Sequence, residues 1–170
     1  MSTERLTSAF YQCDVLDVAP NLLGKLLCYV DGSEVRRGRI TEVEAYRGET
    51  DTACHAHAGR TKRTEVLYLG GGHAYVYLCY GIHHLFNVVT GPEGQPQAAL
   101  IRGIEGFPGP GRLTKALDIT LDNNRTDLTI SPNLWLEDDG YRPPALKTSP
   151  RIGIAYASEE DQARLWRWYV

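Results

Sequence analysis

The most informative part of this chain is AYVYLCYGIHHLFNVVT, residues 74–90. Its first half, Ala74 to Tyr80, is rich in tyrosine, and Gly81 follows at once. Its second half, Leu85 to Thr90, resumes with β-branched and apolar residues. This pattern predicts two antiparallel strands joined near Gly81. Tyr80 would then stand close to the tip of the hairpin, where its ring is exposed.

A second predicted strand, Arg37 to Tyr46, precedes the hairpin and has an unusual face. The turn signal Asp31-Gly32 separates it from an earlier strand at residues 28–30. In a regular strand, alternate side chains point to opposite faces. Two carboxylates and an aromatic ring then share one face, while the opposite face is small and apolar enough to lie against a core. The two sets are Ile40, Glu42, Glu44 and Tyr46 against Thr41, Val43 and Ala45.

The other elements follow from periodicity and turn signals. Leucines recur between Asn21 and Leu27, and Pro20 precedes them, which predicts a helix there. Hairpins with few separate helices predict an α+β fold with a mostly antiparallel sheet. No repeat or linker-like change in composition divides the chain, so we expect residues 1–170 to form one domain. Further predicted elements are a strand at Ala98–Ile104, a helix at Arg112–Leu117, a loop at Pro143-Pro144, a strand at Arg151–Tyr156 and a terminal helix at Glu159–Trp166.

The composition is that of a compact globular protein. The chain has 170 residues, of which 42% are hydrophobic and 23% charged, and this excludes a disordered scaffold. The uncharged stretch Val66–Pro92 is broken by glycines and carries histidines, so no membrane span is predicted. Residues 1–10 lack the apolar segment of a secretion signal, so we expect the protein to stay inside the cell. Four cysteines without a Cys-x-x-Cys pair predict free thiols and no zinc.

Charge is unevenly distributed along the chain. The net charge is −3, from 18 basic and 21 acidic residues, whereas DNA-binding domains are usually basic. Between Thr52 and Leu117, however, six bases face three acids, and from Asp118 onward nine acids face six bases. The sequence is therefore compatible with a positive face in its middle part, although composition alone does not establish one.

Glu44 is the first candidate for chemistry. A carboxylate beside Tyr46 on a strand face can be partly desolvated, which raises its pKa and suits it to accept a proton from water. The alternative is an exposed acid on an edge strand. Glu42 and Glu44 lie roughly 7 Å apart along a strand, a separation close to that of paired-carboxylate glycosidases. His55-x-His57 lacks a third metal ligand beside it, so a histidine that hydrogen-bonds to a substrate is the preferred interpretation.

Three tyrosines of residues 74–90 offer flat rings. Tyr75, Tyr77 and Tyr80 could stack on nucleobases, because every base has a flat face that an aromatic ring accepts. Tyr75 and Tyr77 could equally be inner residues of a sheet core. The core alternative is weaker for Tyr80, since it directly precedes the turn glycine.

Basic residues near these tyrosines could contact phosphates. Gly109-Pro110-Gly111 could present backbone N–H groups to a phosphate, or could only begin a helix. The cluster at residues 60–63 could hold a nucleic-acid backbone or be a solvated loop. The expected nucleic-acid contacts are Arg60, Arg63, Arg112 and Lys115.

Seven blocks of the chain, taken in order, resemble the alkyladenine DNA glycosylase family, the 3-methyladenine DNA glycosylases of the mammalian type. They keep the family's order and spacing over nearly the whole chain. Gly70-Gly71-Gly72-His73 replaces a stiffer connection, which predicts a looser start to the hairpin. The blocks are LGKLL at 23–27, GRITEVEAY at 38–46, DTACHA at 51–56, YVYLCYG at 75–81, FNV at 86–88, LIRGIE at 100–105 and RIGI at 151–154.

The resemblance implies a curved sheet with flanking helices and a protruding hairpin that probes double-stranded DNA. It implies a monofunctional enzyme without a metal or other cofactor. Nothing in the sequence indicates an obligate partner, so we expect a monomer. Such an enzyme flips a damaged purine out of the duplex and hydrolyses its N-glycosidic bond, which leaves an abasic site. The lesion range, among 3-methyladenine, hypoxanthine and ethenoadenine, stays open at this point.

The resemblance also implies a role for each matching residue. Glu44 activates the attacking water, and Arg102 and the backbone carbonyl of Ile152 help to hold it. Tyr46 and Tyr77 stack against the flipped base. The remaining matches are His55, which borders the pocket, Asn87, which opposes the amino group of guanine, and Tyr80, which wedges into the duplex.

Two other functions are compatible with the residues alone. One is a module that binds DNA lesions without hydrolysing them. The other is a hydrolase of free nucleosides or sugars that uses Glu42 and Glu44 as a carboxylate pair. The second alternative would leave Arg102, Tyr80 and the basic loop without a common purpose.

Overall fold

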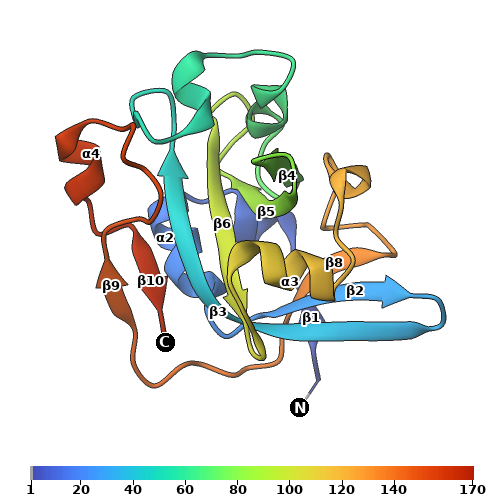
Figure 1. The fold of residues 1–170 in the computed structure, drawn as a ribbon. Coiled ribbons are helices and arrows are strands. Elements are labelled where there is room, and N and C mark those ends of the chain that lie inside the picture. The colour runs from blue at the N-terminus through green and yellow to red at the C-terminus, as the bar shows by residue number, and fades with distance from the viewer. Residues whose placement is uncertain (1) are drawn as a thin grey trace.

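The computed structural model describes residues 2–170, which form a sheet of ten strands (Figure 1). Every pairing is antiparallel, and the fold class is α+β, as predicted. The main path runs in the order β1 (Glu4–Arg5), β8 (Leu134–Asp138), β2 (Leu26–Asp31), β3 (Glu34–Arg47), β6 (Gln97–Ile104), β5 (His83–Thr90) and β4 (Ala74–Cys79). The remaining strands are β7 (Phe107–Pro108) on β6, β10 (Arg167–Tyr169) on β3, and β9 (Lys147–Ser149) on β10.

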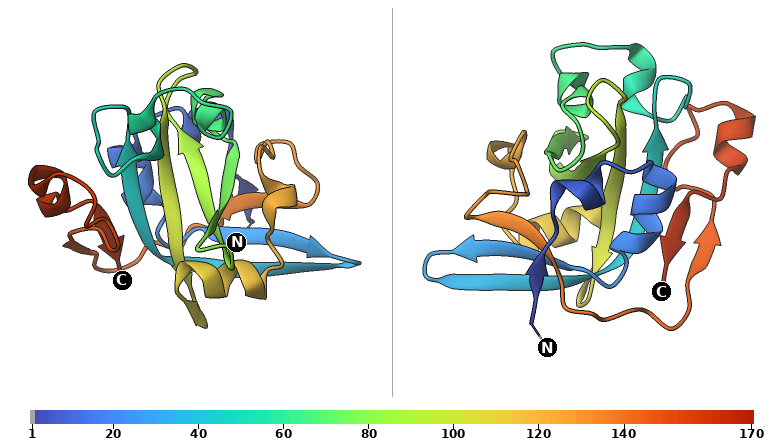
Figure 2. Two further views of the ribbon diagram at one scale, coloured as in Figure 1. Left: turned by 45° about the horizontal axis from the view of Figure 1, so that its top comes forward. Right: turned by 180° about the vertical axis from the view of Figure 1, so that it is seen from behind.

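Short helices flank this sheet. In Figure 1, α2 lies behind the sheet and α3 in front of it, and the rear view in Figure 2 brings α2 forward. Within residues 2–170, no helix has the length and apolar character needed to cross a membrane. The α-helices are α1 (Ser8–Tyr11), α2 (Val15–Leu22), α3 (Pro110–Ala116) and α4 (Glu159–Ala163), and the 3₁₀ helices are η1 (His55–Ala58), η2 (Thr64–Tyr68) and η3 (Leu121–Asn123).

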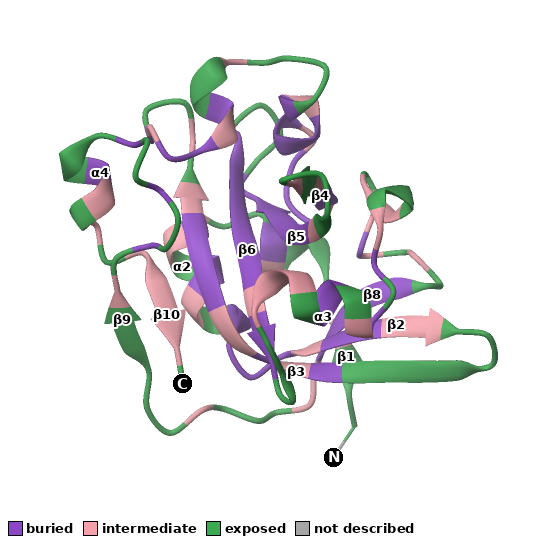
Figure 3. Cartoon of the chain, in the orientation of Figure 1, coloured by how far each residue is buried: buried purple, intermediate pink, exposed green. Residues whose placement is uncertain are grey.

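Hydrophobic side chains gather on both faces of the central strands. The larger cluster joins α2, α3 and the sheet face that carries Val43 and Ala45. The smaller cluster lies on the opposite face, where η1 and η2 cover residues such as Tyr75 and Ala98. Figure 3 shows β5 and β6 buried over most of their length, while the far end of the β2–β3 hairpin is exposed. The candidate site described below lies on the face of the smaller cluster.

Several predicted elements are confirmed. The hairpin consists of β4 and β5, and the strand at residues 98–104 is β6. The helix that follows Gly109 is α3. The turn at residues 31–32 joins β2 to β3.

The predicted helix at Asn21–Leu27 is wrong. The helix of this region, α2, ends at Leu22, and Leu26 already belongs to β2. It begins earlier because the Asp14 side chain accepts a hydrogen bond from the N–H of Leu16 and caps its first turn. Leu22 and Leu27 are buried in one core, but they reach it from α2 and β2, so the spacing of the leucines imitates a single helix.

The predicted elements of the C-terminal region need correction. Residues 151–156 form an irregular loop instead of a strand. Helix α4 ends at Ala163, before the predicted end at Trp166, and the chain continues into β10. The loop is held by side-chain contacts between residues far apart in the sequence, and these contacts leave no local periodic pattern.

The face assignment of β3 is correct from Glu42 onward and wrong for Ile40. Ile40 packs in the larger core together with Val43. The ladder between β3 and β6 is irregular on both sides of Glu42, where Thr41 has no partner. A bulge inserts one residue and therefore exchanges the faces on either side of it. Strict alternation could not predict this exchange.

The start of the β4–β5 hairpin is tight, in contrast to the looser connection predicted from its glycines. The N–H of Gly71 bonds to the carbonyl of Gly91, and the N–H of Gly72 bonds to that of Val89. A Cβ at Gly71 would stand only 2.2 Å from the carbonyl oxygen of Tyr11. Glycine is required here by a close backbone approach, which fixes the hairpin to α1.

A buried ion pair anchors the loop at residues 150–157. Arg151 Nη1 lies 2.6 Å from Asp51 Oδ2, and Nη2 lies 3.0 Å from Oδ1. Both side chains are inaccessible to solvent. Arg151 also donates to the carbonyl of Ala45 on β3. The loop is thus held against the end of β3.

We expect Arg151→Met to lower the free energy of unfolding by about 3–5 kcal/mol, because it leaves the Asp51 carboxylate buried without its cation. Equilibrium unfolding in urea measures this loss. The matched control is Arg142→Met, which removes an exposed arginine paired with Asp138. The control should cost less than about 1 kcal/mol. Equal losses in the two variants would contradict the anchoring role of Arg151.

Candidate active site

A cavity of about 530 Å³ opens on the sheet face that carries the smaller cluster. Its walls come from β3, β4, β5, β6, η1, the start of α3 and the loop after Pro150. Eight of the predicted site residues line it, although they are spread from position 46 to position 152. They are Tyr46, His55, Tyr77, Tyr80, Asn87, Arg102, Arg112 and Ile152.

Glu44 lies directly behind the cavity wall and is 0% exposed. Its Oε1 accepts a hydrogen bond from the Tyr46 hydroxyl at 2.8 Å, and its Oε2 accepts one from the N–H of Ile152 at 2.6 Å. Arg102 Nη1 stands 3.5 Å from Oε1. All three partners line the cavity, so they separate the carboxylate from the open space.

Burial dominates the ionisation of Glu44. Desolvation raises the pKa of its carboxyl group above the ordinary value of 4.5, against the opposing effects of Arg102, the Ile152 N–H and the Tyr46 hydroxyl. A carboxylate in this setting is a stronger proton acceptor than an exposed one, although two hydrogen-bond donors and the charge of Arg102 still favour its charged form. The alternative of an exposed acid on an edge strand is therefore wrong.

Arg102 faces the carboxylates of Glu42 and Glu44 on β3. Its Nε donates to Glu42 Oε2 at 3.0 Å, while its Nη1 points toward Glu44. Glu42 also accepts a hydrogen bond from Arg167 Nε at 2.7 Å. Glu42 is absent from the cavity lining, and its oxygen is occupied by two guanidinium groups. This arrangement disfavours a hydrolase that would use Glu42 and Glu44 as equivalent partners.

Three aromatic side chains form a continuous wall. The ring of His55 lies 4.6 Å from that of Tyr77, and Tyr75 lies 5.4 Å from Tyr77. The hydroxyl of Tyr75 hydrogen-bonds to His55 Nδ1 at 2.8 Å. Tyr75 is buried in the smaller cluster, as the core interpretation predicted, and it also lines the cavity.

The imidazole of His55 is neutral at ordinary pH. Desolvation, and next the charge of Arg63, lower the pKa of His55 from 6.5 to about 4. His57, by contrast, points elsewhere, and its Nδ1 hydrogen-bonds to the carbonyl of Glu49. Across residues 2–170, no three His, Cys, Asp or Glu side chains are grouped as metal ligands would be.

Asn87 forms part of the cavity wall on β5. It is buried, and its Nδ2 donates to the carbonyl of Tyr75 at 3.1 Å. This hydrogen bond runs between the two paired residues of β4 and β5. The orientation of the amide is therefore fixed by the backbone of the neighbouring strand.

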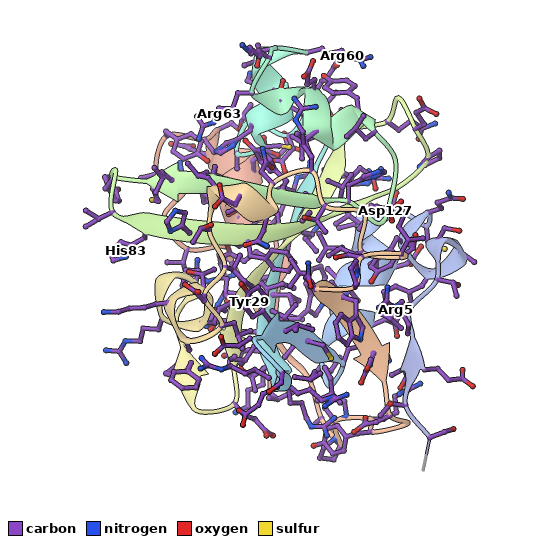
Figure 4. The ribbon with its side chains drawn as sticks, turned by 90° about the vertical axis from the view of Figure 1, so that its right-hand side faces the viewer. Arg5, Tyr29, Arg60, Arg63, His83 and Asp127 are labelled. Carbon is purple, nitrogen blue, oxygen red and sulfur yellow. The ribbon has the colours of Figure 1, made fainter. Side chains whose placement is uncertain are left out.

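Tyr80 is 92% exposed at the tip of the hairpin. Its φ angle is +53°, in the left-handed region that residues other than glycine rarely adopt. The prediction of an exposed ring at the tip is confirmed. Figure 4 shows the hairpin projecting sideways from the body of the molecule, with His83 near its tip. The turn from Cys79 to Ile82 has positive φ at both central residues, Tyr80 and Gly81, as type I′ hairpin turns do, so the turn accounts for this conformation.

The predicted basic contacts are distributed around the site. Arg112 lines the cavity, and Arg63 lies 5.4 Å from the ring of Tyr77. Arg60 packs over the ring of Tyr68, and in Figure 4 it lies farther from the projecting hairpin than Arg63 does. Arg60, Arg63 and Lys115 lie outside the cavity lining.

Tyr156 is a cavity residue that the sequence analysis did not identify. It is exposed at the rim, and its hydroxyl donates to the carbonyl of Ala53 at 2.7 Å. Sequence reasoning placed it in a strand, and only the irregular loop brings it to the cavity. The one sequence feature that could have identified Tyr156 is an aromatic residue close to the RIGI block.

Comparison with known proteins identifies the family. The chain matches the family described as methylpurine-DNA glycosylase (MPG) over residues 9–108 and 106–170. Three bacterial relatives carry the name "Putative 3-methyladenine DNA glycosylase". The Borrelia garinii subsp. bavariensis protein is 43% identical over 95% of this chain and 93% of its own length. The Sodalis glossinidius protein is 43% identical, with 99% and 98% covered, and the Myxococcus xanthus protein 47% identical, with 95% and 89% covered.

These matches extend over nearly the whole chain, including every element that lines the cavity. They agree with the family that the seven sequence blocks resemble. The chain belongs to the methylpurine-DNA glycosylase family.

Proposed function

We propose that the protein flips a damaged purine out of double-stranded DNA and hydrolyses its N-glycosidic bond with a water activated by Glu44. The observation that carries the proposal is the buried Glu44 carboxylate, which contacts Tyr46, Arg102 and Ile152 on the wall of an aromatic cavity. The whole chain acts as one monomeric unit. The product is an abasic site with an intact DNA backbone.

The shape and chemistry of the cavity suit a flat purine. The rings of Tyr46 and Tyr77 supply apolar faces for stacking, and His55 lies against Tyr77. Because His55 is neutral, it can hydrogen-bond to a base without placing a positive charge beside it. Asn87 would meet the exocyclic amino group of guanine and disfavour that normal base.

Hydrolysis draws on the charge of Glu44 in two ways. Departure of the purine develops positive charge on the deoxyribose, which a nearby carboxylate stabilises. The same carboxylate accepts a proton from the attacking water, and Arg102 and the carbonyl of Ile152 hold that water. No covalent enzyme intermediate is needed. Among the described residues, no lysine lines the cavity, which disfavours a lyase step through an amine nucleophile.

DNA would bind across the cavity opening. Tyr80 would fill the gap left by the flipped nucleotide, since its exposed ring stands on the projecting hairpin. Arg63 and Arg112 stand close to the cavity and would meet the DNA backbone. Arg60 and Lys115 would add more distant phosphate contacts.

We expect Glu44→Gln to bind lesion-containing duplex normally and to release base at least about 100-fold more slowly, because the amide cannot accept the proton. Single-turnover release from a hypoxanthine-containing duplex, followed by alkaline strand cleavage, measures this rate. The matched control is Glu105→Gln, an exposed position outside the cavity wall, which should keep the wild-type rate. Release by Glu44→Gln at the wild-type rate would contradict the role of Glu44. Binding without release by the wild-type protein would instead favour a lesion-binding module.

We expect base release to fall as the pH drops below the raised pKa of Glu44. Glu44 acts in its charged form, so protonation removes the base, and the rate decreases about tenfold per pH unit below this pKa. The midpoint should lie above 4.5. Protonation of His55 does not explain this decrease in rate, because the pKa of His55, about 4, lies below the expected midpoint. His55→Asn should therefore keep the same midpoint. A midpoint at or below 4.5 in the single-turnover rate would contradict the desolvation of Glu44.

We expect Tyr80→Ala to weaken binding to a lesion-containing duplex by roughly tenfold or more, because one stacked ring contributes about 1–3 kcal/mol. Fluorescence anisotropy at constant salt measures the affinity. The control Ile130→Ala also truncates a well-exposed hydrophobic side chain, but one outside the cavity lining. Equal affinities for Tyr80→Ala and the wild type would exclude the wedge.

A further inference from the structure

The position of Arg102 on β6 depends on an irregularity in the sheet. Glu42 is paired with Gly103, whereas the next residue, Val43, is paired with Ile101. Arg102 therefore has no partner in the ladder with β3. Bulges of this kind redirect a side chain, and they occur often beside active sites. The backbone alone does not determine how near the guanidinium group lies to Glu42 or to Glu44.

Glu42 supplies the missing constraint. Its Oε2 accepts hydrogen bonds from Arg102 Nε at 3.0 Å and from Arg167 Nε at 2.7 Å. Arg167 is held in turn by Ser149, whose hydroxyl accepts from Nη1 at 2.6 Å. The anchor thus extends through β10 to β9, and Glu42 joins it to Arg102.

The structure assigns to Glu42 the role of a positioning residue, which holds Arg102 by its Nε and so keeps the guanidinium group from closing onto Glu44. This inference rests on the proposed function, because it concerns the base of that reaction. Glu42 itself touches neither the cavity nor the reacting atoms. It would act through Arg102.

The argument is a competition between two carboxylates for one guanidinium group. Arg102 stands 3.0 Å from Glu42 but 3.5 Å from Glu44, so Glu42 has the closer contact. A planar guanidinium prefers a two-pronged pair with one carboxylate. Without Glu42, Arg102 would form that pair with Glu44 and occupy an oxygen that must accept the proton of water.

Other charged and titratable groups around Glu44 leave this competition unchanged. Tyr46 and the N–H of Ile152 donate their hydrogen bonds to the Glu44 oxygens, so neither of them competes as an acceptor for Arg102. Arg151, on the same loop, is already neutralised by Asp51. Tyr156 donates to the carbonyl of Ala53. Glu42 is therefore the carboxylate that opposes Glu44 for Arg102.

The test is a double-mutant cycle of Glu42→Gln and Arg102→Met, measured as single-turnover release from a hypoxanthine duplex across pH. Glu42→Gln should lower the plateau rate by roughly 10- to 100-fold, because a displaced catalytic group loses its alignment. The acidic limb of the pH–rate profile should also move to lower pH by about one unit. The reason is that Arg102 then pairs closely with Glu44 and lowers the pKa of its carboxyl group. In the Arg102→Met background, Glu42→Gln should leave the plateau rate unchanged.

Each alternative gives a different result. If Glu42→Gln acted only by removing a negative charge near Glu44, the acidic limb of the pH–rate profile would move but the plateau rate would stay the same. This movement of the limb would also occur in the Arg102→Met background. A purely structural role would lower the rate equally in both backgrounds. Either result overturns the inference. If Glu44→Gln releases base at the wild-type rate, the proposed function fails first, and this outcome is independent of Glu42.

Two further variants protect the test against misfolding. Asp139→Asn removes a carboxylate paired with Arg39 away from the cavity, and it should keep both the limb and the rate. In Arg167→Met, Arg102 is the remaining guanidinium group that bonds to Glu42 Oε2. Arg102 should then move away from Glu44, so the pKa of Glu44 rises and the acidic limb of the pH–rate profile moves to higher pH. A shift of the same size for Arg167→Met without Arg102 would show a direct charge effect and overturn the inference. Thermal unfolding and duplex affinity confirm that each variant is folded.

Discussion

The burial of one carboxylate is the constraint on which the rest of the site depends. Glu44 is inaccessible to solvent, and an isolated charge in such a place would cost several kcal/mol or more. Two hydrogen-bond donors and one cation offset this cost, and they come from different parts of the chain: the Tyr46 hydroxyl from β3, the Ile152 N–H from the loop after Pro150 and the Arg102 guanidinium group from β6. Any arrangement that keeps Glu44 charged must bring these three parts together. The same three residues form part of the cavity wall, so stabilising the charge also builds the pocket.

The loop that carries Ile152 has no regular hydrogen-bond ladder, and side chains hold it instead. The guanidinium group of Arg151 pairs with Asp51 and lies between the rings of Tyr46 and Trp166, at 4.9 and 5.0 Å from their centres. The Tyr46 ring is thus supported from one side by a cation that is already neutralised. Hydrogen bonds from Arg151 to Asp51 and to the carbonyl of Ala45 hold the loop against the end of β3, which explains how an irregular segment can place a single N–H within 2.6 Å of a carboxylate oxygen.

The parts of this structure that follow from local patterns could be predicted from the sequence, and those that depend on distant contacts could not. Alternation correctly placed Glu42, Glu44 and Tyr46 on one face, but it failed at Ile40, because the bulge at Thr41 depends on pairing with β6. The tip of the hairpin was predictable because Gly81 marks it within a few residues. The loop at 151–156 was not, since Arg151 finds its partner 100 residues earlier in the chain.

The distant contacts also decide which candidate residues meet. Resemblance to a family placed Glu44, Arg102 and Ile152 in one site, whereas spacing along the chain could not have related them. Tyr156 escaped both routes, because its place depends on the path of the loop rather than on its neighbours in sequence. The alternatives for Tyr75 were not exclusive, since a ring can fill a core with one edge and line a cavity with the other.

The site has a buried part around Glu44 and an exposed part at Tyr80, and these two parts lie on different elements of the fold. Around Glu44, every polar group of the carboxylate has a partner, and the surrounding strands are buried. Tyr80, at the tip of the hairpin, has almost no contact with the body of the protein. The hairpin joins these two parts because its start is fixed by the close approach of Gly71 to Tyr11, while its tip extends into solvent. The exposed ring and the buried carboxylate therefore lie in parts of the site that are held by different contacts.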